Sequence, residues 1–354
     1  MKRVIAFIHK QLALFLGIFL IVQALSGVLI SFRHELTDLV FETYNCKEES
    51  CHIVSFASLY DKFILDHTFV DLYDVVFPSY PGAPYQFSYD SGSDSLPSIA
   101  FLDPYSGETI SSGNLLQYPF EVAIYIHSNL LLGSVGKNLV VMTGLFFILM
   151  SISGLYLWWP GKLSLFKKSV DINWKGPALK RNFQVHKTFG FYFFCLFLFL
   201  GITGTMIAGK KFYLPALSFE YQQIVETDIK KKINLESILS ESRKEYPSGE
   251  IRVIKFLGID DDLIRVDIID KADYFAGKKN QLIFQANNGA LLKNLSDENI
   301  STSRSIYQWL IPLHSGKIIG LTGRFLNLIT GIALLTVMTY GYLLWFRRRR
   351  RQKK

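Results

Sequence analysis

Four long apolar stretches constrain this 354-residue chain more than any other feature of its sequence. Each is long enough to cross a bilayer as a helix, since about 20 mostly apolar residues span a hydrocarbon core of about 30 Å. Apart from Lys10 near the start of the first, they contain no charged residue; they are Phe7–Phe32, Leu139–Trp159, Phe189–Ala208 and Phe325–Phe346. We therefore predict an α-helical membrane protein with four transmembrane helices.

The distribution of positive charge gives these helices an orientation. With four crossings both termini lie on one side of the membrane, together with the segments Met1–Lys10, Pro160–Lys187 and Arg347–Lys354. These segments are rich in Lys and Arg, and Asp171 is their only acidic residue. Because positively charged loops stay in the cytoplasm, we expect a multi-pass protein of the bacterial inner membrane with both termini cytoplasmic. The net charge of +8 then reflects contact with the lipid bilayer, and we expect no nucleic-acid partner.

The two long connections on the opposite side have the residue patterns of folded domains. Two segments are typical of helices, namely Phe56–Leu65 and Leu235–Tyr246. Alternating apolar residues predict six strands, at Leu72–Phe77, Tyr85–Tyr89, Ser98–Leu102, Ile251–Leu257, Leu263–Ile269 and Gln281–Ala286. We expect two periplasmic α+β modules, each with its own antiparallel sheet.

These features divide the chain into eight segments. They are transmembrane helix 1 in 1–36, periplasmic module 1 in 37–118, an outer-face His segment with helix 2 in 119–160, a cytoplasmic loop in 161–182, helix 3 in 183–210, periplasmic module 2 in 211–308, a second outer-face His segment with helix 4 in 309–346, and a basic cytoplasmic tail in 347–354. In module 1 an oxidising periplasm favours a disulfide between Cys46 and Cys51, with two free thiols or a metal site as the alternatives. Cys195 is expected to be a small packing residue in helix 3.

An internal repeat gives the strongest functional signal. One ungapped alignment places His127 on His314 and also matches Gly133 with Gly320, Gly136 with Gly323, Lys137 with Arg324, Gly144 with Gly331, Gly154 with Gly341 and Trp158 with Trp345. A second places His9 on His186 and matches Lys10 with Lys187, Ser26 with Thr203 and Gly27 with Gly204. We interpret the chain as a tandem duplication whose halves are related by a pseudo-twofold axis along the membrane normal.

This symmetry pairs four of the seven histidines. His9 pairs with His186 near the inner face, and His127 pairs with His314 near the outer face. A twofold axis places such residues on opposite sides of itself, where each pair is suited to hold a planar ligand. Haem is the natural candidate, because its iron takes two axial imidazoles from opposite faces. The four histidines are therefore the expected axial ligands of one haem at each pair.

The remaining parts of each haem site are also expected from matched positions. Close backbone approach to the haem ring is expected at Gly27, Gly204, Gly144 and Gly331, and pairing with the propionates at Lys10, Lys187, Lys137 and Arg324. Each residue type also has a plainer interpretation, since His or Lys at an interface is commonly an anchor and Gly commonly serves helix packing. His34, which matches Lys211, is a reserve outer-face ligand, and His52 and His67 are expected at the surface.

Several motifs occur in order along the chain: His9-Lys10 before a span that contains Ser26-Gly27, Ile126-His127, the segment Gly154–Pro160, Val185-His186-Lys187, and Leu313-His314-Ser315-Gly316. Together they resemble the PepSY-associated transmembrane-helix proteins, the iron-regulated inner-membrane proteins of siderophore uptake. The resemblance implies PepSY-like external modules, two b-type haems on the four paired histidines, and electron transfer across the inner membrane, in some members to a periplasmic ferric siderophore. Lys10 and Lys187 stand where Arg is expected, which weakens any bidentate contact with a propionate.

The leading functional hypothesis is a di-haem oxidoreductase that reduces a periplasmic ferric siderophore or another ferric chelate. Its electrons are expected from quinol or a cytoplasmic reductase, because Gly133–Gly136 lacks the strand context and third glycine of a dinucleotide-binding loop. One alternative is a permease for a metallophore or peptide, disfavoured because the spans have no acidic residue for proton coupling and no broken helix near the midplane. The other is a membrane-anchored PepSY-type regulatory protein, disfavoured because an anchor has no use for His at matched depths.

Overall fold

A computed structural model describes residues 1–40, 53–67, 70–92, 96–213, 233–257, 263–270, 280–296 and 302–352. The chain divides into two compact units. The first, which we call the membrane unit, contains Met1–Arg33, Val122–Tyr213 and Leu310–Lys354. The second, the sheet unit, contains His34–Glu121 and Leu214–Trp309. The predicted disulfide of Cys46 with Cys51 lies outside the described residues, as does His52.

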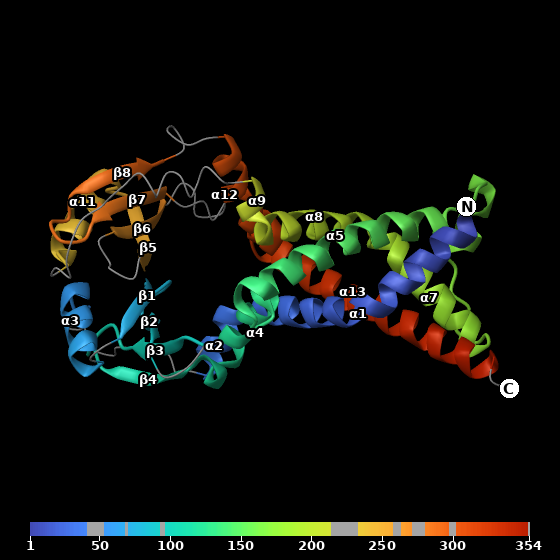
Figure 1. The fold of residues 1–354 in the computed structure, drawn as a ribbon, viewed down its shortest axis with the longest axis horizontal. Coiled ribbons are helices and arrows are strands. Elements are labelled where there is room, and N and C mark those ends of the chain that lie inside the picture. The colour runs from blue at the N-terminus through green and yellow to red at the C-terminus, as the bar shows by residue number, and fades with distance from the viewer. Residues whose placement is uncertain are drawn as a thin grey trace. The chain divides into compact units, whose positions relative to one another are not determined.

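Long apolar helices make up the membrane unit (Figure 1). They are α1 (Lys2–Ile30), α5 (Gly133–Trp158), α7 (Ala178–Tyr192), α8 (Phe194–Ala208) and α13 (Gly320–Gln352). By length and composition the described residues contain three helices able to cross a membrane, at Lys2–Ile30, Gly133–Trp158 and Lys317–Arg350. The pair α7 and α8 qualifies as a fourth span when it is taken together. The predicted four apolar stretches thus all fall on helices, three of them continuous.

The third predicted span is broken rather than straight. α7 and α8 are bent by 64° with respect to each other, and the break falls at Phe193, whose φ of −95° and ψ of 3° lie in the sparsely populated bridge region. No Pro lies around Phe193, but Gly190 stands three residues before the break, so the sequence carried a weak signal for a kink that the prediction of one straight span did not use. The rings of Phe189, Phe193 and Phe197 stack in sequence across the break, with centroids 6.3 and 6.0 Å apart, and pack with the apolar core. The third predicted span is therefore two helices joined by a bend.

The helices close into a ring around an apolar core. α1 packs against α5 and α13, and both of these pack against α7 and α8 on the far side (Figure 1). Buried residues from α1, α5, α8 and α13 meet in the middle: Leu20, Phe147, Met150, Phe197, Ala333, Val337 and Met338. This ring of helices is the scaffold on which the paired histidines are mounted.

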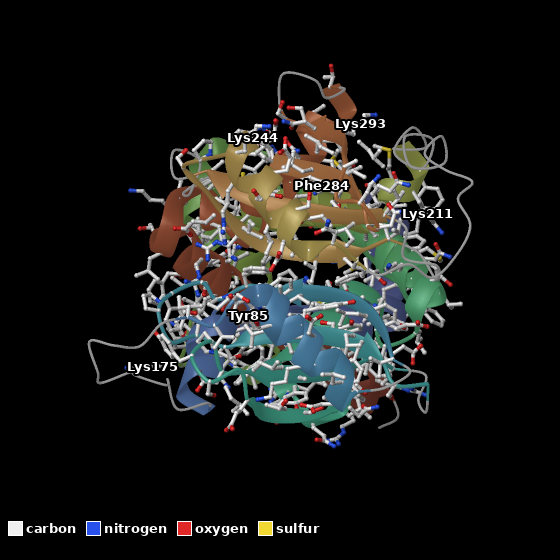
Figure 2. The ribbon with its side chains drawn as sticks, turned by 90° about the vertical axis from the view of Figure 1, so that its left-hand side faces the viewer. Tyr85, Lys175, Lys211, Lys244, Phe284 and Lys293 are labelled. Carbon is white, nitrogen blue, oxygen red and sulfur yellow. The ribbon has the colours of Figure 1, made fainter. Side chains whose placement is uncertain are left out.

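The sheet unit contains eight strands. They are β1 (Asp71–Val76), β2 (Tyr85–Asp90), β3 (Ser98–Leu102), β4 (Thr109–Asn114), β5 (Gly249–Phe256), β6 (Leu263–Asp270), β7 (Asn280–Gln285) and β8 (Leu291–Leu295). Helices α3 (Phe56–Asp66) and α11 (Leu235–Glu245) contribute to one core cluster with alternate residues of these strands. Tyr85 and Phe284, labelled in Figure 2, belong to this cluster although they come from different segments of the chain.

The expectation of two modules with separate sheets is corrected by the strand order, which is β4-β3-β2-β1-β5-β6-β7-β8 in a single antiparallel sheet. β1 pairs with β5, and Val75 faces Ile254 in the register. Both residues are fully buried, and Lys255 donates to Asp74 across the same two strands at 3.1 Å. Each segment's first strand would otherwise be an exposed edge of a four-stranded sheet, and pairing these two edges with each other removes both.

Shorter elements connect these parts. They are α2 (Arg33–Val40), η1 (Leu115–Gln117), α4 (Pro119–Asn129), η2 (Leu163–Leu165), α6 (Phe166–Val170), α9 (Lys210–Tyr213), α12 (Thr302–Ser315) and η5 (Lys317–Ile319). α4 and α12 matter most for function, because they carry His127 and His314 near their C-terminal ends.

Candidate functional site

The inner pair of histidines meets between α1 and α7. The imidazole centroids of His9 and His186 are 6.4 Å apart, and the ring planes are inclined by 80°. His9 Nδ1 lies 2.9 Å from the Ser153 hydroxyl on α5. His186 Nδ1 lies 2.8 Å from the carbonyl oxygen of Val337 on α13. Each ring is thus held by a hydrogen bond from its own helix to a neighbouring one. The inner pair therefore involves residues of α1, α5, α7 and α13.

The outer pair has the same arrangement. The centroids of His127 and His314 are 6.2 Å apart, with ring planes inclined by 45°. His127 Nδ1 contacts the Gln23 carbonyl oxygen at 3.0 Å and the Ser26 hydroxyl at 3.2 Å, both on α1. His314 Nδ1 contacts the Thr203 hydroxyl on α8 at 2.9 Å. Ser26 and Thr203 are matched in the repeat, and both are buried.

These contacts define which ring nitrogen carries the proton. The carbonyl oxygens of Gln23 and Val337 only accept hydrogen bonds, so Nδ1 of His127 and Nδ1 of His186 must donate. The hydroxyls of Ser153 and Thr203 donate to carbonyl oxygens of their own helices, at 3.0 and 2.8 Å, and so accept from Nδ1 of His9 and His314. Every Nδ1 is therefore a donor, and in the neutral ring every Nε2 keeps its lone pair for a ligand.

A glycine lies against each imidazole ring. A Cβ atom built on Gly204 would stand 2.9 Å from His314 Cε1, and one on Gly27 would stand 3.1 Å from His127 Cε1. At the inner pair, a Cβ on Gly341 would stand 3.2 Å from His186 Nδ1, and one on Gly154 would stand 3.5 Å from His9 Cε1. A side chain at the first three positions would push the ring away, so these glycines allow the rings to sit where they do.

The other two glycines predicted to face a planar ligand have a different neighbour. A Cβ on Gly144 would meet Thr205 of α8, and a Cβ on Gly331 would meet Val28 of α1. These residues permit close approach of neighbouring helices, which is the common use of glycine in membrane helices. Gly154 and Gly341, matched in the sequence alignment without an assigned role, are the glycines beside the inner imidazoles.

The four predicted cationic residues divide into two groups. Lys10 and Lys187 adjoin the inner histidines in sequence, and their ammonium groups lie over the Phe7 and Phe183 rings at 5.4 and 5.9 Å. Lys137 is exposed near the start of α5. Arg324 donates from Nε and Nη2 to the Ser31 carbonyl oxygen at 2.9 and 2.8 Å, where it caps the end of α1. The propionate roles of these four residues stay predictions.

The histidines outside the pairs have other surroundings. His67 belongs to the sheet unit, where its ring stacks on Phe63 with centroids 4.3 Å apart, so it is half-buried rather than at the surface. The side chain of His34 lies outside the described residues. Among the residues that are described, no cluster of three or more His, Cys, Asp or Glu is suited to a metal ion, and Cys195 is exposed with a free thiol.

Sequence reasoning missed the groups that hold the imidazoles in place. Two of the four are backbone carbonyl groups, of Gln23 and Val337, and no side-chain pattern marks a carbonyl. The Ser26 and Thr203 hydroxyls were visible as a matched pair beside matched glycines. The sequence did contain a signal for them. Each hydroxyl residue comes directly before a matched glycine, so a hydrogen-bonding group and a position without a side chain are neighbours on the helix.

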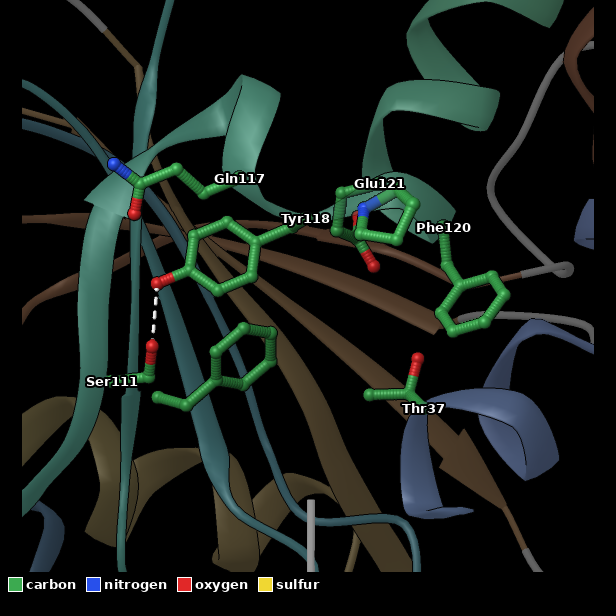
Figure 3. A pocket seen from close by; sticks show the side chains of 8 residues that line it. Thr37, Ser111, Gln117, Tyr118, Phe120 and Glu121 are labelled. Atoms are coloured by element: carbon green, nitrogen blue, oxygen red, sulfur yellow. Dashed lines mark hydrogen bonds between the residues drawn. The ribbon is translucent and has the colours of Figure 1, made fainter. Parts of the chain in front are cut away.

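The sheet unit has a cavity of its own, of about 230 Å³. Figure 3 shows Thr37, Ser111, Gln117, Tyr118, Phe120 and Glu121 among the residues that line it. The hydroxyls of Ser111 and Tyr118 are hydrogen-bonded at 2.9 Å, and burial raises the pKa of the Tyr118 phenol above its ordinary value. The phenol is therefore protonated at neutral pH. Sequence analysis had no signal for this cavity.

Comparison with known proteins agrees with the architecture. The chain finds no match among curated proteins. The sequence profile described as PepSY-associated TM region matches residues 6–348, which is nearly the whole chain. With its candidate membrane spans and the ordered histidine motifs within the matched range, this protein is a membrane protein that belongs to the PepSY-associated TM region family.

Proposed function

We propose that this protein holds two b-type haems between its paired histidines and transfers electrons across the inner membrane to a ferric siderophore or another ferric chelate in the periplasm. The observation that supports this most directly is the geometry of the two imidazole pairs. When bound, each haem would supply a one-electron iron couple whose potential depends on its axial ligands and on the burial of the site.

The separation of the rings would leave room for one metal centre between the members of each pair. An imidazole nitrogen binds a metal ion at about 2.0–2.1 Å and lies roughly 1.1 Å from the ring centre, so two opposed imidazoles place their centroids about 6.2–6.4 Å apart. The observed separations are 6.4 Å at the inner pair and 6.2 Å at the outer pair. Rings that only packed against each other would not need this particular distance. Each Nε2 also has a lone pair available for a ligand, because Nδ1 is the atom that donates to the protein.

Buried amide groups beside both pairs add to this fit. Gln23 Nε2 and Asn182 Nδ2 are buried without a hydrogen-bond partner among the described residues. Gln23 lies one turn before Gly27 on α1, and Asn182 lies one turn before His186 on α7. Both groups are donors, and a donor left unpaired in an apolar interior is costly. A ligand with acceptor groups between the imidazoles accounts for both.

The spacing of the two pairs supports transfer across the membrane. On α1, His9 and the outer-pair neighbour Gly27 are separated by about 27 Å at a rise of 1.5 Å per residue. A hydrocarbon core is about 30 Å thick, so one pair lies near each face. The buried residues between them are apolar, and two of them are aromatic, Phe147 and Phe197, with ring centroids 5.8 Å apart. An apolar core of this kind would keep water away from the path between the two pairs.

The direction of transfer follows from the proposed orientation. His9 and His186 would hold the haem that receives electrons, and His127 and His314 would hold the haem nearer the acceptor. Quinol from the bilayer and a cytoplasmic reductase are the two classes of donor open to the inner pair. At the outer face, reduction loosens a ferric chelate, because ferrous iron binds hard oxygen ligands less strongly than ferric iron. In this proposal no side chain of the chain acts as a catalytic acid or base.

A permease for a metallophore or peptide is the second candidate, and the break between α7 and α8 is the observation in its favour. Broken helices near the bilayer centre are typical of transporter binding sites. Here, however, the break is filled by Phe189 and Phe193 packed against the apolar core, and α8 contains no charged residue. A polar substrate would find no described partner there, so the redox function is the better supported.

Haem content of the purified protein tests the proposal. Protein made in haem-supplied cells should carry two haems and show a Soret band that shifts on reduction. His127→Ala and His314→Ala should each lose one haem, and His9→Ala and His186→Ala should each lose the other. The matched control His67→Ala, in the sheet unit, should keep both. A wild-type protein without haem would overturn the proposal.

The substrate is tested separately in proteoliposomes. With reductant on the inside and a ferric chelate outside, wild-type protein should reduce the chelate, and His9→Ala or His314→Ala should lower the rate at least a hundredfold. If both haems are present and reducible while the chelate is never reduced, the electron-transfer site stands and the assignment of its acceptor is wrong.

A further inference from the structure

α7 contains a buried polar side chain that the imidazole pairs do not use. Asn182 is 2% exposed, and its Nδ2 has no hydrogen-bond partner among the residues that the structure describes. The other polar side chains near it on α7 are paired: Thr188 donates to the Val170 carbonyl oxygen at 3.3 Å, and Gln184 accepts from the Asn173 backbone N–H at 3.1 Å. Asn182 therefore differs from these neighbours, because its buried Nδ2 donor has no acceptor among the described residues.

The position of Asn182 relates it to the inner histidine pair. It precedes His186 by four residues, which puts both side chains on the same face of α7, about 6 Å apart along the helix axis. Asn182 is the nearer of the two to Ala178, where α7 begins. A ligand between His9 and His186 that extends toward the start of α7 would meet its amide.

The repeat shows that the fold itself does not need an amide at this position. Asn182 is matched by Ile5 on α1, in the alignment that matches His186 with His9. An apolar residue therefore serves at the equivalent place, one turn before the other inner imidazole. Of these two equivalent positions, only the one on α7 has a hydrogen-bond donor. This difference suits a ligand whose two sides are unlike, because helix packing alone is satisfied by the apolar residue.

We propose that Asn182 donates a hydrogen bond from Nδ2 to a carboxylate of the haem held by His9 and His186. This inference rests on the haem sites proposed above. A carboxylate is the acceptor on the haem edge, and a hydrogen bond to an ionised acceptor is about twice as strong as one between neutral groups. Half-buried Lys187, next to His186, adds positive charge on the same segment. Asn182 is thus a positioning residue that fixes which edge of the haem faces the start of α7.

The test uses full-length protein in nanodiscs that carries only the inner haem, through His127→Ala and His314→Ala. In this background Asn182→Leu is compared with the parent, and Gln184→Leu serves as the matched control, since it removes a paired amide from the same helix. Haem release is followed by transfer to excess apomyoglobin. We expect Asn182→Leu to release haem about ten- to a hundredfold faster, the loss expected for a hydrogen bond to a charged group, and Gln184→Leu to stay within twofold.

A second ligand separates carboxylate binding from a general structural effect. Haem dimethyl ester lacks the charged carboxylates, so the parent and Asn182→Leu should release it at rates within threefold of each other. Without haem, Asn182→Leu should melt at the same temperature as the parent or higher, because it removes an unpaired buried amide.

The outcomes distinguish this inference from the proposed function. If Asn182→Leu speeds release of haem and of its dimethyl ester equally, or lowers the melting temperature of the haem-free protein by several degrees, Asn182 is a packing residue and the inference is wrong. If release of haem is unchanged, the inference is also wrong while the haem site stands. If the parent binds no haem at all, both fail.

Discussion

At the scale of single residues, the four imidazoles differ in how many groups hold them. His127 Nδ1 has two acceptors, the Gln23 carbonyl oxygen and the Ser26 hydroxyl. Among the described residues, His314 Nδ1 donates to the Thr203 hydroxyl alone, at 2.9 Å. Matched positions of the repeat therefore have unequal importance. The His314 ring, with one anchor among the described residues, should depend more strongly on its hydroxyl partner.

We expect Thr203→Val to weaken haem binding at the outer pair more than Ser26→Ala does. Losing the group that orients a metal-bound histidine typically costs about 10- to 100-fold in affinity, and His127 keeps the Gln23 carbonyl oxygen when Ser26 is changed. Haem titration of each variant in a background with His9→Ala measures the outer site alone. Equal losses in the two variants would show that the hydroxyls are not the anchors.

The four glycines beside the rings predict a graded series. Alanine at Gly204 brings a Cβ to 2.9 Å from His314 Cε1, whereas alanine at Gly154 makes an ordinary contact at 3.5 Å with His9 Cε1. Gly204→Ala should therefore displace the anchored His314 ring and lower the occupancy of the outer haem, while Gly154→Ala should keep both haems. Haem-to-protein ratios measure the series. A greater loss in Gly154→Ala than in Gly204→Ala would contradict it.

At the scale of helices and strands, the junction of β1 with β5 holds the sheet unit together. Ile254 is fully buried in it, whereas Lys255 and Asp74 form an ion pair whose side chains are 37% and 23% exposed. We expect Ile254→Ala to destabilise the sheet unit by about 2–5 kcal/mol, and Lys255→Ala by no more than about 1 kcal/mol. Protease sensitivity of the sheet unit in urea measures both. If Lys255→Ala is the more harmful, the packing argument fails.

The sequence predicted those elements whose side chains alternate or repeat with a clear period. The strands from Tyr85 and from Ser98 and the helix from Leu235 lie where expected. β4 was missed because Ser111, Ser112 and Gly113 show no apolar alternation, and its place follows only from pairing with β3. Likewise, the single sheet depends on the long-range pair of Val75 with Ile254, which neither segment reveals alone.

The candidate site was predictable to a similar extent. The repeat gave the pairing of the four histidines, because symmetry relates residues that are far apart in sequence. It did not distinguish Gly144, which faces Thr205, from Gly154, which faces an imidazole. Both are small residues on one helix, and only the rotation of α5 against its neighbours decides which side chain each one meets.

At the scale of the whole molecule, the orientation in the membrane is open to a direct test. Lys175, between α6 and α7, and Lys62, on α3, are both exposed. In a chain freed of its own cysteines, a membrane-impermeant maleimide should label Lys62→Cys in intact spheroplasts and Lys175→Cys only after permeabilisation, as the positive charge around α6 predicts. The reverse pattern would invert the proposed direction of electron flow.

The pairing of β1 with β5 also sets the order in which the protein is made. β1 ends at Val76 and β5 begins at Gly249, so at about 5–20 residues per second the ribosome needs on the order of ten to thirty seconds to supply the partner. Until then β1 is an open edge that invites aggregation. Two candidate membrane spans, α5 and the pair α7 and α8, lie between these strands in the chain, so the first four strands wait for both to be made before the sheet can close.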